Sequence, residues 1–169
     1  PGELVAFLGP NGAGKTTTLH MLITMLPPSA GRARVGGYDV VEEHRAVRSL
    51  IGMVFQEPAL DTRLTGRENL AIHAALYAIP RRRTQGVIDD ALAWASLAEA
   101  GDRGVRTYSG GMRRRLDLAA GLVGDPELIF LDEPTTGLDV RSRQALWGVV
   151  GDLAASGVTV FLTTQYLEE

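Results

Sequence analysis

A glycine-rich loop near the start of the chain limits the folds that the rest can adopt. Residues 9–16 read Gly-Pro-Asn-Gly-Ala-Gly-Lys-Thr and fit the pattern G-x-x-x-x-G-K-[ST]. A short apolar run, residues 4–8, precedes the loop, and apolar residues at helical spacing follow it through Leu19, Leu22 and Ile23. Strand, tight turn and helix in this order are the context in which such a loop binds phosphate. The pattern predicts an α/β fold with a parallel sheet.

The loop also supplies candidate ligands for a nucleotide. Its glycines allow backbone N–H groups to point at a phosphate, and the following helix N-terminus adds a favourable potential. We expect Lys15 to reach the β- and γ-phosphates and the Thr16 hydroxyl to bind Mg²⁺. The loop by itself leaves ATP and GTP both open. The predicted nucleotide-binding residues are nine consecutive ones: Gly9, Pro10, Asn11, Gly12, Ala13, Gly14, Lys15, Thr16 and Thr17.

Two adjacent carboxylates follow a strongly apolar segment. Residues 128–131 form a continuous apolar run, as in a strand buried on both faces, and Asp132 and Glu133 come next. The carboxyl end of such a strand is where an open parallel sheet forms its ligand crevice. Asp132 suits Mg²⁺, because a hard cation takes oxygen ligands. Glu133 is a candidate general base that activates an attacking water.

Strand and helix patterns alternate along most of the chain. Further strands are predicted at residues 51–55 and 158–162 and a helix at 141–155, with short antiparallel strands around 32–41. We therefore expect a P-loop NTPase with three α/β/α layers and a mainly parallel sheet. Its core would comprise about 1–60 and 110–169, with an inserted helical subdomain at about 61–109.

Composition excludes several classes of function. Lys and Arg number 17 against 20 Asp and Glu, and this net charge of −3 gives no general attraction for nucleic acid. The chain has no cysteine, and no apolar run approaches the ~18 residues of a membrane span. We expect a chain of cytosolic character without a nucleic-acid partner. Because it begins at Pro1 and stops soon after a strand, we also expect a single domain truncated at both ends.

A second glycine-rich segment lies about two dozen residues before the two carboxylates. Residues 108–112 read Tyr-Ser-Gly-Gly-Met. Ser109 is a plausible N-cap for a helix that begins at Gly110 and Gly111. The free N–H groups and positive end of that helix form an anion site without any lysine. The chain therefore has two candidate phosphate sites.

These motifs, in this order, resemble the nucleotide-binding domain of ATP-binding cassette (ABC) proteins over essentially the whole chain. Residues 9–16 resemble the Walker A motif, Gln56 the Q-loop, 108–112 the signature, 128–133 the Walker B motif with its catalytic glutamate, and 137–139 the D-loop with Asp139. The resemblance implies ATP as the nucleotide. It also implies Mg²⁺ bound by Thr16, Gln56 and Asp132.

The family resemblance implies partners as well. Its domains associate head to tail, so the signature of one copy completes the ATP site of the other. We therefore expect a homodimer in which Ser109, Gly110, Gly111 and Met112 contact the partner's ATP. The resemblance further implies a transmembrane permease subunit and a peripheral location on the cytoplasmic face of the membrane.

One position departs from the common family pattern. Gln165 stands where most ABC domains carry a switch histidine. An amide can donate a hydrogen bond to the γ-phosphate but cannot titrate near neutral pH. With Met-Arg-Arg-Arg-Leu after the signature, this glutamine resembles the daunorubicin/doxorubicin-resistance exporters. We therefore assign Gln165 a catalytic place beside Glu133.

The leading hypothesis is the ATP-hydrolysing subunit of an ABC exporter of drug or lipid-like substrates. A soluble ABC ATPase of the DNA-repair type would carry a very long coiled coil between Gln56 and the signature, where this chain has a short helical interval. A translation factor with two cassettes and a nucleotide-binding regulator without turnover stay open as alternatives.

Overall fold

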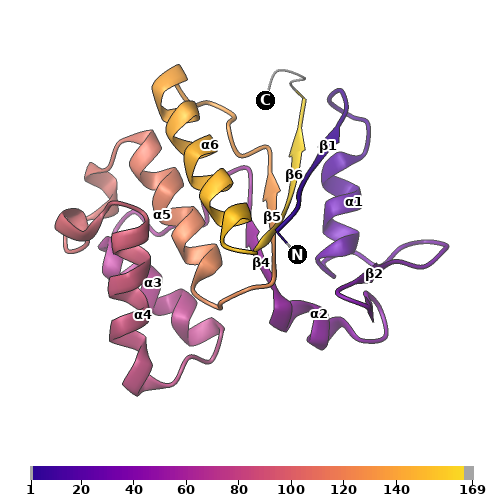
Figure 1. The fold of residues 1–169 in the computed structure, drawn as a ribbon, viewed down its shortest axis with the longest axis horizontal. Coiled ribbons are helices and arrows are strands. Elements are labelled where there is room, and N and C mark those ends of the chain that lie inside the picture. Colours follow the sequence, from indigo (N-terminus) through magenta and orange to yellow (C-terminus); the bar gives the residue numbers. More distant parts are fainter. Residues whose placement is uncertain (1, 166–169) are drawn as a thin grey trace. The chain divides into compact units, whose positions relative to one another are not determined.

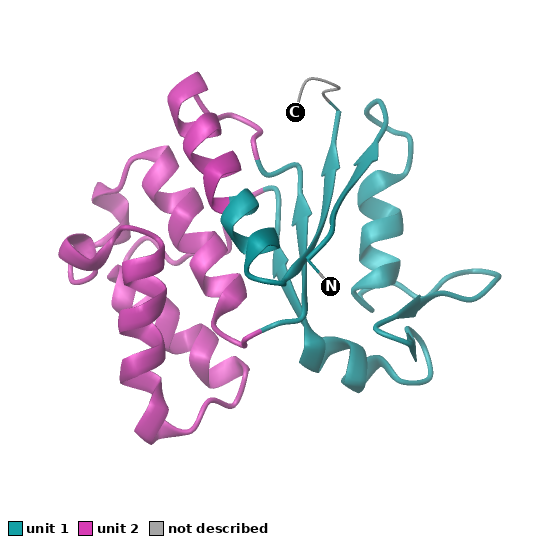
Figure 2. Ribbon diagram, in the orientation of Figure 1, with its two compact units in different colours: residues 1–56, 126–134, 150–169 teal, residues 57–125, 135–149 magenta. Residues whose placement is uncertain are grey.

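The computed structural model describes residues 2–165, and the chain divides into two compact units (Figures 1 and 2). Unit 1 comprises residues 1–56, 126–134 and 150–169, and unit 2 comprises residues 57–125 and 135–149. Each unit has a hydrophobic core of its own.

Unit 1 is built on a four-stranded parallel sheet. The strands are β1 (Leu4–Leu8), β4 (Ile51–Val54), β5 (Leu128–Asp132) and β6 (Thr159–Thr164), in the order β1-β6-β5-β4. Strand β5 lies between two neighbours and is buried along almost its whole length, which explains its continuous apolar sequence. Because all four strands are parallel, their carboxyl ends lie at one edge of the sheet.

Two helices and a small hairpin complete the part of unit 1 that precedes β4. Helix α1 (Lys15–Leu22) follows β1, and α2 (His44–Leu50) precedes β4. Between them lies the predicted antiparallel pair, β2 (Arg34–Val35) and β3 (Tyr38–Asp39). Leu19, Val47 and Phe130 are fully buried in the core that these elements share. Helix α2 was not apparent from the sequence, because its seven residues are too few for a clear period.

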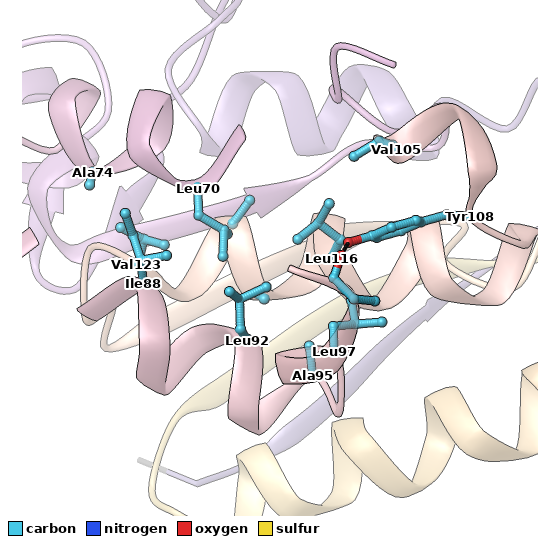
Figure 3. Packing of buried hydrophobic residues seen from close by; sticks show 13 residues of the cluster. Leu70, Ala74, Ile88, Leu92, Ala95, Leu97, Val105, Tyr108, Leu116 and Val123 are labelled. Atoms are coloured by element: carbon cyan, nitrogen blue, oxygen red, sulfur yellow. Dashed lines mark hydrogen bonds between the residues drawn. The ribbon is translucent and has the colours of Figure 1, made fainter. Parts of the chain in front are cut away.

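Unit 2 is helical. Helices α3 (Gly66–Leu76), α4 (Arg81–Trp94) and α5 (Gly110–Leu122) pack around one apolar core, and Figure 3 shows the side chains of its members. Two 3₁₀ turns, η1 (Ala98–Ala100) and η2 (Val105–Thr107), lie between α4 and α5. The core is made by apolar residues at helical spacing, among them Leu70, Ala74, Ile88, Leu92, Leu116 and Val123.

Tyr108, the first residue of the signature segment, is a core residue of unit 2. It is buried, and its hydroxyl donates a hydrogen bond of 2.6 Å to the carbonyl of Ala100. A Cβ at Gly66 would lie 2.6 Å from this hydroxyl, so glycine is needed there. The tyrosine thus anchors the segment that leads to Ser109.

Helix α6 (Val140–Ala155) contributes to both units: residues 140–149 group with unit 2 and the rest with unit 1. Helix α5 also groups with the helices of unit 2, because Leu116, Ala119 and Ala120 belong to their core. This grouping is wider than the helical subdomain expected at about 61–109, whose boundaries stay a prediction. The predicted α/β fold with a parallel sheet is confirmed.

Candidate functional site: a phosphate loop and a signature helix

The phosphate loop connects β1 to α1 in unit 1, as the sequence pattern predicts. Gly14 immediately precedes the helix with φ of 87°, a left-handed conformation that glycine adopts without steric cost. Lys15 is the first residue of α1 and is buried. Its Nζ donates to the carbonyls of Gly9, at 2.8 Å, and Pro10, at 3.3 Å. The loop therefore curls around the ammonium group of its own lysine.

Asp132 ends strand β5 beside the start of α1. Its Oδ1 accepts hydrogen bonds from the hydroxyls of Thr16, at 3.3 Å, and Thr163, at 2.6 Å. Hydroxyl and carboxylate oxygens are hard donors, and two of them about 3 Å apart can occupy neighbouring positions of an octahedral Mg²⁺ shell. Thr16 and Asp132 thus fit the predicted metal. Among residues 2–165 no group of three or more His, Cys, Asp or Glu side chains could hold a metal ion.

Glu133 follows β5 and meets two of the other predicted site residues. Its Oε1 lies 3.4 Å from Lys15 Nζ, and its Oε2 accepts from Gln56 Nε2 at 3.5 Å. The backbone of Glu133 is left-handed, with φ of 42°, which is uncommon for a residue with a side chain. Its N–H donates to the Thr163 carbonyl at 3.2 Å and to the Thr163 hydroxyl at 3.0 Å. The carboxylate is therefore held in one orientation from both ends.

Thr163 is a site residue that sequence reasoning missed. Strand register places it opposite Asp132, and its fully buried hydroxyl donates to that carboxylate while it accepts from the Glu133 N–H. A threonine near the end of an apolar strand is too common to single out. The only available signal was that its strand precedes Gln165.

Gln56 and Gln165 follow the ends of two other strands of the sheet. Gln56 comes after β4 and is exposed, and Gln165 comes directly after β6 and is partly buried. The side chain of Gln56 donates to Glu133, which lies next to Asp132 in sequence. Its predicted role as a Mg²⁺ ligand and the predicted contact of Gln165 with a phosphate stay predictions.

The signature residues lie in unit 2, at the start of α5. Ser109 is the N-cap, and its hydroxyl accepts from the Met112 N–H at 3.2 Å. Ser109 and Gly110 are exposed and Gly111 is partly buried. The N–H groups of the first turn are thus presented at a capped helix N-terminus, which is a suitable site for an anion.

Asp139, the predicted D-loop residue, also lies in unit 2, just before α6. Its Oδ1 accepts from the Ser142 N–H at 3.0 Å, and its Oδ2 accepts from the Ser142 hydroxyl at 2.6 Å. These hydrogen bonds, the hydroxyl's first, lower the pKa of Asp139 below its usual range. The residue caps its helix and stays a carboxylate at neutral pH.

The geometry of unit 1 defines a class of protein. A lysine in a glycine loop, a hydroxyl and carboxylate pair that suits Mg²⁺, and a second carboxylate beside that lysine lie at the carboxyl edge of one parallel sheet. This is the arrangement of P-loop nucleotide-binding proteins. No helix among residues 2–165 is long and apolar enough to cross a membrane.

Comparisons with known proteins identify the family. Residues 1–136 match the family model described as ABC transporter. The chain therefore belongs to the ABC transporter family, as the motifs predicted. A solved structure, cbiO1 from Clostridium perfringens, described as part of the ABC transporter complex cbiONQ, superposes with a TM-score of 0.88 and 27% identity, covering 98% of this chain and 68% of that one.

The similar curated proteins are ATP-binding proteins of drug resistance and export. Identity is 54% with the daunorubicin resistance ATP-binding protein DrrA3 of Streptomyces coeruleorubidus, over 99% of this chain and 53% of that protein. It is 49% with the doxorubicin resistance ATP-binding protein DrrA of Mycobacterium tuberculosis, over 99% and 51%. It is 42% with the Nod factor export ATP-binding protein I of Paraburkholderia xenovorans, over 100% and 56%. The predicted resemblance to the daunorubicin/doxorubicin-resistance type is confirmed, and the chain spans about half the length of these relatives.

Proposed function

We propose that this chain binds ATP with Mg²⁺ and hydrolyses it to ADP and phosphate, as the energy-supplying subunit of an ABC exporter. The observation that carries the proposal is the contact between Lys15 and Glu133, both largely buried, beside the Thr16–Asp132 pair. Lys15 suits the charge of the phosphates, the Thr16–Asp132 pair suits the metal, and Glu133 suits the attacking water. All three functions are needed for phosphoryl transfer to water.

The phosphate loop binds the polyphosphate. Backbone N–H groups of residues 11–16 and the N-terminus of α1 attract the phosphate oxygens. Lys15 Nζ exchanges the carbonyls of Gly9 and Pro10 for the β- and γ-phosphates, to which it donates charge-assisted hydrogen bonds. Thr16 and Asp132 hold Mg²⁺, with Gln56 as the third predicted ligand. When bound, the metal would supply positive charge that offsets the negative charge of the phosphates during transfer.

Glu133 acts on the water. Its carboxylate accepts a proton from the water whose oxygen forms the new bond to the γ-phosphorus, while the bond from that phosphorus to the bridging oxygen breaks and ADP leaves. The hydrogen bonds from Thr163 to the Glu133 backbone hold the base in place for this step. Gln165 donates its amide N–H to the γ-phosphate, so this contact does not titrate near neutral pH.

The signature of one copy of the chain acts on the ATP that a second copy binds. Ser109, Gly110, Gly111 and Met112 bind the γ-phosphate of the partner's ATP through the first turn of α5. This helix end carries no lysine and no acidic residue in its first turn, so it binds an anion but supplies no proton acceptor. Each ATP then lies between two copies, and Asp139 belongs to the same interface.

The energised partner is a transmembrane permease subunit on whose cytoplasmic side this chain is a peripheral subunit. Support comes from the names of its relatives, which are ATP-binding proteins of daunorubicin and doxorubicin resistance and of Nod factor export. An apolar or amphiphilic exported molecule, a drug or a lipid-like compound, agrees with these names.

The experiment is steady-state phosphate release by the intact protein together with its membrane subunit. Glu133→Gln keeps the size of the side chain and removes the proton acceptor, so we expect turnover to fall about 10²–10⁴-fold while ATP still binds. Glu127→Gln is the matched control, because Glu127 is exposed just before the same strand. Equal rates for Glu133→Gln and the parent protein would overturn the assigned base. Tight binding to DNA or to the ribosome without a membrane subunit would overturn the proposal that the chain belongs to an exporter.

A further inference from the structure

Inside unit 2 the signature helix α5 and the helix α6 that follows the D-loop approach each other at Gly111 and Ser142. A Cβ built at Gly111, in the first turn of α5, would lie 2.8 Å from the Ser142 Oγ and 3.3 Å from its Cβ. A carbon this close to a hydroxyl oxygen is not tolerated. Gly111 is therefore needed for space, and its backbone is ordinary helix. Its neighbour Gly110 differs, since a Cβ there would meet nothing within 4 Å.

The Ser142 hydroxyl cannot easily turn away from this contact. It donates to Asp139 Oδ2 at 2.6 Å, and the Ser142 N–H donates to the other oxygen of the same carboxylate. Two hydrogen bonds to one carboxylate fix both the backbone and the side chain of the serine. Rotating the hydroxyl to make room at Gly111 would break the shorter bond.

The starts of α5 and α6 also line one pocket. The pocket has a volume of about 280 Å³. It is lined by residues of both helix starts and by arginine side chains, among them Ser109, Gly111, Met112, Arg114, Leu138, Ser142 and Leu146. The Ser142 oxygen, held by Asp139, limits how closely a side chain at Gly111 can approach α6.

We propose that Ser142 is a positioning residue that joins the D-loop to the signature, with its hydroxyl held by Asp139 and in contact with Gly111. A displacement of Asp139 then moves Ser142 and, through it, the first turn of α5. This inference rests on the proposed function, in which both segments belong to the interface that encloses ATP. Ser142 reaches the nucleotide only through Asp139 and Gly111.

The test is a set of variants of the intact protein, measured for thermal unfolding and for ATP hydrolysis with the membrane subunit. We expect Gly111→Ala to lower the unfolding midpoint by about 2–4 °C and to raise the KM for ATP about 10-fold. Adding Ser142→Ala to Gly111→Ala removes the clashing oxygen and should restore most of both quantities. Adding Ser142→Thr keeps the hydroxyl and should restore neither.

Gly110→Ala is the control for the rescue: its Cβ enters open space, so any rise in KM comes from the part that Gly110 itself takes in the proposed phosphate site. Combining it with Ser142→Ala should bring no recovery of KM, because there is no contact to relieve. Recovery of the midpoint without recovery of KM would overturn the positioning role, and recovery of neither would overturn the contact itself. If the parent protein hydrolyses no ATP, the proposed function fails and the positioning role with it. Loss of the rescue in an active protein counts against the Ser142 inference and leaves the proposed function standing.

Discussion

Two helices of this chain begin after a glycine-rich segment, α1 in unit 1 and α5 in unit 2, but they are built differently. Helix α1 follows Gly14, which is left-handed and provides no side-chain cap. Helix α5 follows Ser109, which is extended and caps the helix with its hydroxyl. The start of α1 depends on a backbone conformation, and the start of α5 depends on a side chain.

The surroundings of the two helix starts differ more than the starts themselves. The first residue of α1 is a buried lysine, which lies beside Glu133. The first turn of α5 has no acidic residue, and its charged side chain is that of Arg113. Both helix starts present backbone N–H groups that suit an anion, whereas at the start of α1 a lysine and a carboxylate are also fixed side by side, as chemistry on a phosphate requires.

Each unit also holds a buried ion pair. Lys15 and Glu133 lie 3.4 Å apart in unit 1, and Arg114 and Asp117 lie 3.3 Å apart on α5 in unit 2. Asp117 additionally accepts from the Ala59 N–H at 3.1 Å. Burial raises the pKa of Asp117 to about 6, against the opposing effect of Arg114. The pair in unit 2 is therefore costly to keep charged.

The largest expected effect concerns the pH dependence of this pair. Because the folded-state pKa of Asp117 exceeds the ordinary 3.8, the folded protein binds the proton more tightly than the unfolded chain between about pH 4 and 6. Stability from this group is thus greatest below pH 4 and decreases as pH rises to 6. The difference between the folded-state pKa of about 6 and the ordinary 3.8 corresponds to roughly 3 kcal/mol of unfolding free energy. Asp117→Asn should remove this dependence.

Urea unfolding at several pH values measures this effect. The free energy of unfolding of Asp117→Asn minus that of the parent should rise by roughly 3 kcal/mol from about pH 3.5 to 7. Asp89→Asn is a control for which this difference should change with pH in the opposite direction. The hydrogen bond from Arg67 lowers the pKa of Asp89, so the stabilisation by this carboxylate is lost on acidification. A difference for Asp117→Asn that is flat with pH would contradict the assignment.

The next effect tests how unit 1 fixes its carboxylates. Thr163→Val keeps the shape of the side chain but removes the hydroxyl that serves Asp132 and the Glu133 N–H. We expect a loss of about 1–3 kcal/mol in unfolding free energy and a fall of about 10-fold in ATP turnover. Thr159→Val, at the start of the same strand, should stay within about 0.5 kcal/mol of the parent. An active and stable Thr163→Val would show that the Thr163 hydroxyl is not needed to orient Asp132.

A pair of glycine substitutions tests the difference between the two helix starts directly. Gly14→Ala should cost about 1–2 kcal/mol, because its φ of 87° disfavours any Cβ even though the space around it is open. Gly110→Ala should be neutral or gain up to about 1 kcal/mol, because alanine is the better helix former. Chemical denaturation of both variants gives the sign of the change in unfolding free energy for each. Equal losses would mean that the two glycines serve the same purpose.

The smallest effect concerns the cap of α5. Ser109→Ala removes the hydroxyl that accepts from the Met112 N–H and should cost about 1 kcal/mol, while Ser109→Gly should cost only a few tenths. Thermal unfolding resolves this difference as about 2–4 °C. A Ser109→Ala variant as stable as the parent would show that the first turn of α5 does not depend on the Ser109 hydroxyl.

Much of unit 1 could be predicted because its signals are local. The loop pattern at residues 9–16, the apolar run at 128–131 and the carboxylates after it depend on neighbours in sequence. The same is true of the N-cap Ser109, confirmed by its hydrogen bond to Met112. Local patterns did not reveal α2, which is short, nor the grouping of α5 with α3 and α4, because that grouping comes from contacts between distant helices.

The sequence by itself therefore determined the class of fold, the family and the chemical types of the site residues. The tertiary structure decided which of these residues meet and how each is held. Thr163 became a site residue only through the register of β6 against β5, and Ser142 only through the approach of α6 to Gly111. The physical reason is that hydrogen bonds and close contacts act over a few ångströms in space. Distances between residues far apart in sequence are set by packing and strand register.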